Sequence, residues 1–269
     1  MNSPEEIKEI VKQKYSEIAL NKKSNTAPSC CCSTKSKHTP IPFSVMTDNY
    51  IGIEGYSPEA DLGLGCGLPT QYSTIKKGDV VVDLGSGAGN DCFVARAETG
   101  DTGKVIGIDF TPAMIDRARI NTTKLGYNNV EFILGDLENI PLPDNFADVI
   151  VSNCVLNLVP NKQKVFNEIY RVLKVGGHFS ISDIVVSGKL PDKIKQASEM
   201  YAGCIASAIS LDDYIDCIHE AGFQCASYMN KTPIIIPDEV LINYLSTDEI
   251  SDYKSNPTKI ESINFYADK

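Results

Sequence analysis

Val80-Val81-Val82-Asp83-Leu84-Gly85-Ser86-Gly87-Ala88-Gly89 is the stretch that decides the fold of this chain. A β-branched run, which favours a buried strand, passes into a glycine-rich turn, and a helical pattern follows the turn. A second apolar run, Lys104–Ile108, ends at Asp109, twenty residues after Gly89 (109 − 89). This layout is typical of a unit that holds an adenosyl group, because glycine lets the backbone approach the ligand and the acid accepts hydrogen bonds from ribose hydroxyls.

The charges around the glycine loop indicate which adenosyl compound binds. Asp83 precedes the loop and Asp91 follows it. Two carboxylates repel a pyrophosphate group but attract a ligand that carries an ammonium and a sulfonium group. The loop therefore favours S-adenosylmethionine over a nicotinamide dinucleotide. A glycine-rich turn also joins strands to helices without binding any ligand, so the loop alone leaves that alternative open.

Bulk properties limit the class of protein. The chain has 269 residues, enough for one large domain or for one domain with a smaller appendage. Its net charge of −10 argues against a nucleic-acid partner, since phosphate binding needs clustered cations. No apolar run is long enough to span a bilayer, and the segment from Pro4 to Leu20 is charged and amphipathic rather than a signal peptide. We therefore predict a cytoplasmic protein with no membrane partner.

Strands and helices alternate from residue 80 to about residue 186. Strands are expected at 80–84, 104–109, 130–134, 147–152 and 178–184, and helices at 89–99, 112–124 and 161–174. This alternation predicts an α/β fold with a mostly parallel sheet and helices on both faces. Together with the glycine loop and its acids, it leads us to expect the Rossmann-like class I S-adenosylmethionine-dependent methyltransferase fold.

Three regions are expected along the chain. Residues 1–42 contain an N-terminal helix (4–20) and a flexible, cysteine-containing loop, and residues 43–186 form the S-adenosylmethionine-binding domain. Residues 187–269 form a smaller α+β region that covers the cleft. Within it we expect helices at 191–203, 211–221 and 238–246 and strands at 223–229 and 261–267.

Ligands of open parallel sheets bind at the carboxyl ends of the strands, so the residues there are the candidates for cofactor binding. Met114 is a candidate to pack against an adenine ring, with core packing as the alternative. Asp136 is a candidate to accept a hydrogen bond from the adenine amine, with a turn cap as the alternative. The complete candidate set is Asp83, Gly85, Ser86, Gly87, Gly89, Asp91, Asp109, Phe110, Met114, Gly135, Asp136, Leu137 and Asn153.

The nine cysteines need an explanation, because disulfides in the cytosol are normally transient or catalytic. Cys154 lies at the carboxyl end of the strand expected at 147–152, where we expect it to face the methyl donor. Cys204 follows fifty residues later (204 − 154), and Cys66 lies between two glycines. The chain has no Cys-x-x-Cys pairs, which argues against a structural zinc site. Three separated thiols suit a soft, three-coordinate ligand.

The chain closely resembles the arsenite S-adenosylmethionine methyltransferases over about residues 50–269. The segments that carry the resemblance are Leu64-Gly65-Cys66-Gly67, the run from Asp83 to Cys92, Ser152-Asn153-Cys154-Val155-Leu156-Asn157-Leu158-Val159-Pro160, the run from Arg171 to Gly177, and Gly203-Cys204. The glycine motif and the run from Arg171 are shared by many methyltransferases. The segment around Cys154, together with Cys66 and Cys204, is far more specific.

The resemblance implies roles for the cysteines. Cys154 and Cys204 would be the principal As(III) thiolates, and Cys66 would be a further arsenic ligand or a redox partner. An N-terminal cysteine would complete the set, and the sequence leaves open whether it is Cys30, Cys31 or Cys32. The three other cysteines, Cys92, Cys217 and Cys225, are assigned to packing.

The resemblance also implies the reaction. Methyl groups would pass from S-adenosylmethionine to trivalent arsenic, as arsenite or methylarsenite, free or conjugated to glutathione. The product would be mono- or dimethylated arsenicals, with trimethylation left open, and the role would be detoxification. Thioredoxin or glutathione would supply the reducing equivalents. Two alternatives stay open: a methyltransferase of another small molecule, such as a quinone or a sterol, and a thiol-based arsenic sensor without turnover.

Overall fold

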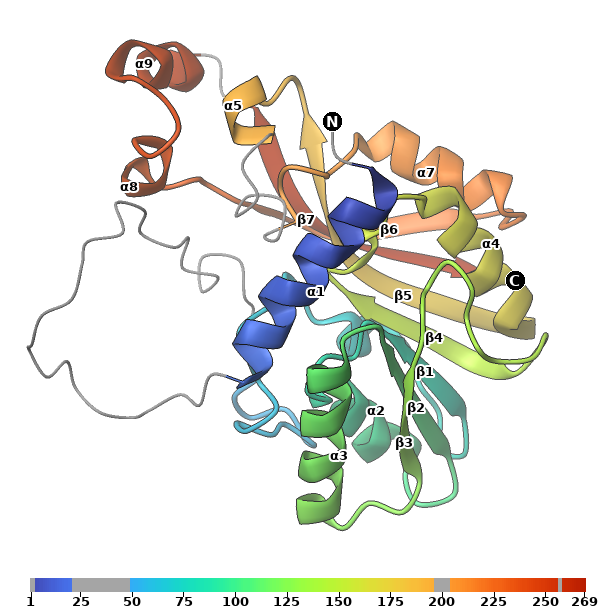
Figure 1. Cartoon of the computed structure of the whole chain (residues 1–269). Helices are drawn as coiled ribbons and strands as arrows, with labels where there is room; N and C mark the ends of the chain where they lie inside the picture. The colour runs from blue at the N-terminus through green and yellow to red at the C-terminus, as the bar shows by residue number, and fades with distance from the viewer. Residues whose placement is uncertain (1–2, 21–48, 196–203, 256–257) are drawn as a thin grey trace, which may run out of the picture.

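The computed structural model describes residues 3–20, 49–195, 204–255 and 258–269. A seven-stranded sheet in the order β3-β2-β1-β4-β5-β7-β6 forms its centre (Figure 1). The first five strands in that order are parallel, and β7 is antiparallel to both of its neighbours. The strands are β1 (Val80–Leu84), β2 (Lys104–Asp109), β3 (Val130–Leu134), β4 (Ala147–Asn153), β5 (Leu173–Ser187), β6 (Ala226–Pro233) and β7 (Lys259–Asp268).

Alternate side chains of β1 point to opposite faces of the sheet, and each face has its own apolar core. Val82 and Leu84 belong to a cluster with Phe166 of α4 (Lys162–Val172) and Tyr214 of α7 (Leu211–Glu220). Val81 belongs to a second cluster, built with α2 (Asn90–Thr99) and α3 (Pro112–Leu125). The predicted class I methyltransferase fold, a mostly parallel sheet with helices on both faces, is therefore confirmed.

A third apolar cluster lies at the carboxyl end of the parallel strands. Val11 of α1 (Pro4–Leu20) packs there with Ile184 of β5 and with residues of α5 (Asp192–Lys195) and α8 (Asp238–Leu241). The predicted helix over residues 4–20 is confirmed, and it lies beside α3 (Figure 1). Cys66, Cys154 and Cys204 belong to this cluster. The N-terminal helix thus reaches the region where the sheet would bind its ligands.

Several element boundaries differ from the sequence prediction. The helix expected over 161–174 ends at Val172, because Leu173 is already extended and begins β5. The strand expected at 178–184 is longer, because β5 already begins at Leu173 and runs through Gly176 and Gly177, and its register with β4 shifts between Ala147 and Val149. The strand expected at 223–229 is displaced to Ala226–Pro233.

The C-terminal region adds β6 and β7 to the main sheet. Of the helix expected over 191–203, α5 covers Asp192–Lys195, and 196–203 lie outside the described residues. The helix expected over 238–246 is only Asp238–Leu241, and α9 (Thr247–Ser255) was not predicted. Its signal is a capping box: Glu249 N–H donates to Ser246 Oγ at 3.3 Å, and Ser246 N–H donates to the Glu249 carboxylate at 2.8 Å.

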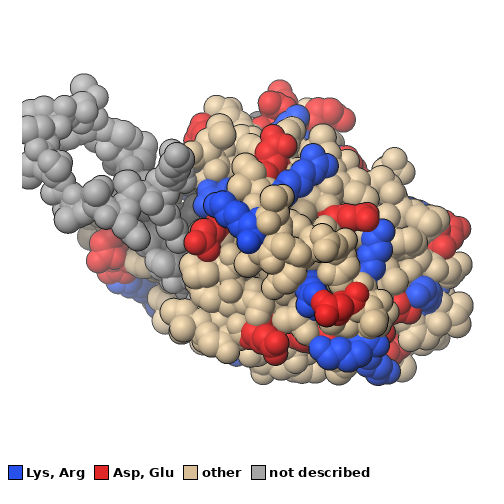
Figure 2. All heavy atoms as spheres, turned by 90° about the horizontal axis from the view of Figure 1, so that it is seen from below, with Lys and Arg blue, Asp and Glu red and all other residues tan. Residues whose placement is uncertain are grey.

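Two surface properties bear on possible partners. No helix in the described part of the chain is both long and apolar enough to cross a membrane. On the face drawn in Figure 2, the lysines and arginines of the described residues are interspersed with aspartates and glutamates. A face of mixed charge lacks the clustered cations that phosphate binding needs.

Truncation of Phe179 in β5 measures how much the packing of the larger core contributes to the free energy of unfolding. Its ring is fully buried between Phe166 and Phe223, with centroid distances of 6.0 and 4.9 Å. Phe179→Ala should lower the free energy of unfolding by about 3–5 kcal/mol, measured by urea denaturation, because it leaves a cavity. Val175→Ala, at an 85% exposed position of the same strand, is the control and should change the free energy of unfolding by less than about 0.5 kcal/mol. Equal effects of the two substitutions would contradict this account of the core.

Candidate active site

A cavity of about 1070 Å³, including its open mouth, lies at the carboxyl ends of β1, β2, β3 and β4. A cavity at this edge of a parallel sheet is where such folds bind small organic ligands. Of the residues predicted to bind a cofactor, nine line this cavity: Gly85, Ser86, Gly87, Asp91, Asp109, Phe110, Asp136, Leu137 and Asn153.

The glycine loop has the backbone geometry that the sequence requires. Gly85 has a φ of +75°, and a Cβ there would collide with the side chain of Val155. Gly87 has a φ of +52° and faces open space beside the cavity. These positions favour glycine because other residues rarely adopt positive φ. The loop backbone therefore comes directly to the cavity wall.

Asp109 closes the loop on the side of β2. Its carboxylate accepts hydrogen bonds from the N–H groups of Gly87 at 3.0 Å and Thr111 at 2.8 Å. Burial raises the pKa of Asp109, against the opposing effect of these hydrogen bonds. Within the described chain, the buried hydroxyl of Ser86 has no hydrogen-bond partner, and Ser86 lines the cavity. An unsatisfied buried hydroxyl near a carboxylate fits a ligand with ribose-like hydroxyl groups.

Asp91 at the start of α2 faces the cavity from the other side of the loop. Tyr50 Oη donates to its carboxylate at 2.7 Å, and Asn153 Nδ2 donates to it at 3.1 Å. Burial raises the pKa of Asp91 to about 6, although both hydrogen bonds favour the ionised form. Within the described lining, four carboxylates (Asp61, Asp91, Asp109 and Asp136) face one cation, Lys8. The electrostatic field of the cavity therefore favours a cationic ligand.

Lys8 of α1 binds the candidate adenine-site acid. Its ammonium group lies 2.7 Å from Asp136 Oδ2 and 3.0 Å from Glu138 Oε2. Burial opposes ionisation of Asp136, but hydrogen bonds from Lys8 and from the Glu138 N–H outweigh it and lower the pKa of Asp136. The ionised carboxylate stays available as an acceptor at the cavity wall.

Four predicted cofactor residues do not reach the cavity. Met114 is fully buried in α3 and is not among the residues that line the cavity, an arrangement that favours the core alternative. Asp83 is buried behind the loop, where its carboxylate accepts a hydrogen bond from the Cys92 thiol at 3.2 Å. Gly89 and Gly135 shape their loops, since a Cβ at either would lie within 3 Å of a neighbouring side chain.

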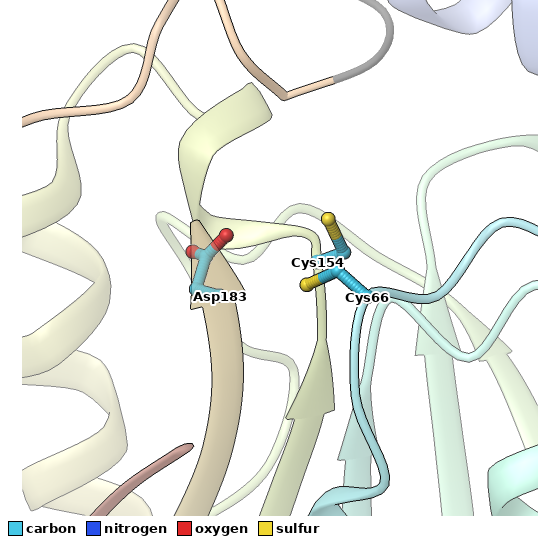
Figure 3. Close-up of side chains that lie close together, drawn as sticks. All are labelled: Cys66, Cys154 and Asp183. Carbon is cyan, nitrogen blue, oxygen red and sulfur yellow. The ribbon is translucent and has the colours of Figure 1, made fainter. Parts of the chain in front are cut away.

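The three predicted arsenic thiols meet beside this cavity. Cys154 lines the cavity, and its thiol interacts with the thiols of Cys66 and Cys204. The Cys204 Sγ also donates to the Cys154 carbonyl at 2.8 Å. Figure 3 shows Cys66 and Cys154 side by side, with Asp183 facing them from β5. Cys30, Cys31 and Cys32 lie outside the described residues.

Two of these cysteines have a strained backbone conformation, and two have a raised thiol pKa. Cys154 has a φ of +58° and Cys204 a φ of +63°, a region that non-glycine residues rarely occupy. Such strain is found most often at functional sites. Hydrogen bonding with Cys204 and Cys66, followed by burial, raises the pKa of the Cys154 thiol well above its usual value, and burial raises that of Cys66. Both thiols are therefore protonated at neutral pH in the free protein.

The sequence analysis missed the part that α1 and Tyr50 play. Lys8, Val11 and Tyr15 all line the cavity, and they lie three and four residues apart, on one face of α1. Tyr15 interacts electrostatically with Cys204 and Cys154, and burial raises its pKa well above the usual value. The spacing of these three residues in the sequence indicates that they share one face of the helix, and this could have predicted their common position at the site. Tyr50 lies in an irregular segment, where no sequence pattern predicts its position at the site.

Comparison with known proteins places the chain among methyltransferases. The sequence model of a family described as "Methyltransferase domain" matches residues 75–232. The arsenite methyltransferase of Halobacterium salinarum is 39% identical over 265 residues, which are 94% of this chain and 63% of that protein. The arsenite methyltransferase of Aquipseudomonas alcaligenes is 32% identical over 241 residues, 87% of this chain and 67% of that protein.

A solved structure agrees with these matches. The arsenic (III) S-adenosylmethionine methyltransferase from Chlamydomonas reinhardtii superimposes with a TM-score of 0.64 at 33% sequence identity, covering 76% of this chain and 67% of that one. The present chain thus spans about two thirds of the length of these relatives. The domain match covers more than half of the chain, and the sequence relatives share at least 32% identity with it. The chain belongs to the arsenite methyltransferase family.

Proposed function

We propose that this protein transfers methyl groups from S-adenosylmethionine to trivalent arsenic held by the thiolates of Cys66, Cys154 and Cys204. The observation that supports this most is one juxtaposition: Cys154 lines the cavity of the glycine loop, and its thiol also interacts with those of Cys66 and Cys204. A cavity suited to a cationic adenosyl compound thus opens onto a cluster of soft ligands.

The residues of the cavity fit S-adenosylmethionine. Asp109, with the unpartnered hydroxyl of Ser86, would hold the ribose, and Asp91 would face the ammonium group. Asp136 and Leu137 line the far wall, where an adenine ring would lie. When bound, this cofactor supplies an electrophilic methyl group.

Loading of the arsenic substrate needs no base. Arsenous acid carries three hydroxides, and each thiol that replaces one sends its proton away with that hydroxide as water. Three As–S bonds form and three As–O bonds break, so the product is neutral. The raised pKa values of Cys66 and Cys154 suit this exchange, because the free site then carries no uncompensated thiolate charge.

The protein then acts mainly by positioning. The arsenic lone pair must point at the methyl carbon in line with the bond that breaks, and holding two reactants so aligned accounts for a large part of many rate accelerations. Cys154, in its strained backbone conformation between the cavity and the other thiols, fixes this direction. The nucleophile carries no proton, so this step needs no general base.

A reductant completes the cycle. Methylation converts As(III) to As(V), and two thiols that form a disulfide return the two electrons. We assign this role to the site thiols together with one of Cys30, Cys31 or Cys32, with thioredoxin or glutathione reducing the disulfide. Mono- and dimethylated arsenicals are the expected products, the role is detoxification, and the location is the cytoplasm.

Serine substitution of the site thiols tests the assignment. Cys154→Ser and Cys204→Ser should each lower arsenite methylation at least about a hundredfold, because a weaker ligand replaces a thiolate that holds the substrate. The measurement is arsenic speciation by chromatography with mass detection, in the presence of S-adenosylmethionine and a thiol reductant. Cys225→Ser, at an exposed cysteine outside the site, is the matched control and should retain activity.

Each alternative function predicts a different result. Normal arsenite turnover by Cys154→Ser would refute the thiolate assignment. Bound cofactor with no methylated arsenic in the wild-type protein would favour another small-molecule substrate. Arsenic binding without any methylated product would favour a sensor.

The protonation state of Asp91 predicts how the affinity for the cofactor depends on pH. A ligand with an ammonium group binds the ionised carboxylate, and the pKa of Asp91 is about 6 in the free protein. The dissociation constant of S-adenosylhomocysteine, measured by calorimetry, should therefore rise about tenfold between pH 7.5 and pH 5, as Asp91 becomes protonated. Asp91→Asn should weaken binding at pH 7.5 and flatten this dependence. An Asp91→Asn profile as steep as that of the wild type would assign the dependence to another group.

A further inference from the structure

Asp183 of β5 is a buried carboxylate that the proposed reaction does not use. Its side chain is 0% exposed, and it faces the two thiols of Cys66 and Cys154 (Figure 3). The two Sγ atoms and one Asp183 carboxylate oxygen all lie within 4.8 Å of one another. The three side chains come from a loop, the end of β4 and β5, so the tertiary structure alone makes this group.

Neighbouring groups fix the orientation of the carboxylate. Asp183 Oδ1 accepts hydrogen bonds from Asn157 Nδ2 at 2.8 Å and from the Ile184 N–H at 2.9 Å. Tyr214 Oη donates to Asp183 Oδ2 at 3.2 Å. Each carboxylate oxygen has more than one lone-pair site, so these bonds leave acceptor capacity toward the thiols.

The charge of this carboxylate is not neutralised by a direct ion pair. No ion pair formed between described residues includes Asp183. Lys162 interacts with it electrostatically, but the Lys162 ammonium donates its hydrogen bond to the Ser207 carbonyl at 3.2 Å. Buried carboxylates are usually either paired or bound to a cation, so the position calls for a cationic ligand.

The two sulfur atoms and one carboxylate oxygen of this group suit a divalent cation better than arsenic. Trivalent arsenic satisfies its valence with three thiolates, whereas zinc accepts cysteine sulfur and carboxylate oxygen together in a tetrahedron. We propose that Cys66, Cys154 and Asp183 form a binding site for Zn²⁺ that excludes arsenic from the same thiols. Binding forms two Zn–S bonds and one Zn–O bond, releases two thiol protons to solvent and leaves one position for water. No electron transfer is involved.

This site does not conflict with the absence of Cys-x-x-Cys pairs. Such pairs identify zinc sites whose ligands are neighbours along the chain. Here Cys154 follows Cys66 by 88 positions (154 − 66), and Asp183 follows Cys154 by 29 positions (183 − 154). The cation site itself is independent of the proposed function, and only the exclusion of arsenic rests on it.

Zinc affinity of the full-length reduced protein tests the proposal. Measurements use a background in which Cys30, Cys31 and Cys32 are serine, so that those adjacent thiols do not compete, and a chromophoric chelator reports the affinity. Asp183→Asn should weaken one zinc site per chain at least about tenfold, because it keeps the shape but removes an anionic donor. Asp212→Asn, at an exposed carboxylate of α7, is the matched control and should bind zinc like its parent. Unchanged affinity in Asp183→Asn would overturn the proposal.

A direct measurement covers the case in which Asp183→Asn fails to fold. In crystals of the wild-type protein soaked with Zn²⁺, the anomalous peak should lie about 2.3 Å from both sulfurs and about 2.0–2.2 Å from an Asp183 oxygen. A peak on the sulfurs alone, or no peak at this site, would overturn the proposal. Neither measurement uses arsenic or the cofactor, so a zinc site in a protein that does not methylate arsenite would refute the proposed function only.

Kinetics test the exclusion of arsenic. Zinc should raise the KM for arsenite of the wild-type protein without lowering kcat, and arsenite should displace bound zinc. Zinc bound at this site without any effect on arsenite KM would overturn the exclusion.

Discussion

A single amide side chain, that of Asn153 at the end of β4, joins the two halves of the site. Its Oδ1 accepts a hydrogen bond from the Cys66 N–H at 3.0 Å, and its Nδ2 donates to Tyr50 Oη at 2.7 Å and to Asp91 at 3.1 Å. The loop before Cys66 packs so closely that a Cβ at Gly65 would lie 2.6 Å from Asn153 Nδ2. The carboxylate that faces the cofactor cavity and the backbone that carries one thiol are therefore held by the same residue.

The site concentrates buried carboxyl groups, and this opposes stability. Burial raises the pKa of both Asp91 and Asp183 to about 6, above the usual value near 4. Between these two pH values the folded state keeps a proton that the unfolded state has lost, so the stability that each group contributes falls as the pH rises through this window. Near neutral pH the fold therefore carries ionised groups that a cationic ligand would stabilise, which fits a cavity built for binding rather than for stability.

The thiols are brought together from distant parts of the chain. Cys66 belongs to an irregular segment, Cys154 follows β4, and Cys204 follows residues outside the described part. The positive φ angles of Cys154 and Cys204 show that the surrounding packing holds both residues in an unfavourable conformation. Their shared apolar cluster includes Val11 of α1, so the N-terminal helix is part of the wall around the thiols.

The sequence by itself determined the sheet and the glycine loop, and it singled out Cys66, Cys154 and Cys204, which the structure brings together. These features depend on local patterns: β-branched runs form strands, glycines with positive φ form the turn, and residues at the carboxyl ends of parallel strands share one edge. Only the tertiary structure decided that Met114 is buried in the core, that Tyr15 reaches the thiols and that Asp183 faces Cys66 and Cys154. The physical reason is that local periodicity reports which residues share a face, whereas contacts between residues far apart in sequence depend on how the faces pack.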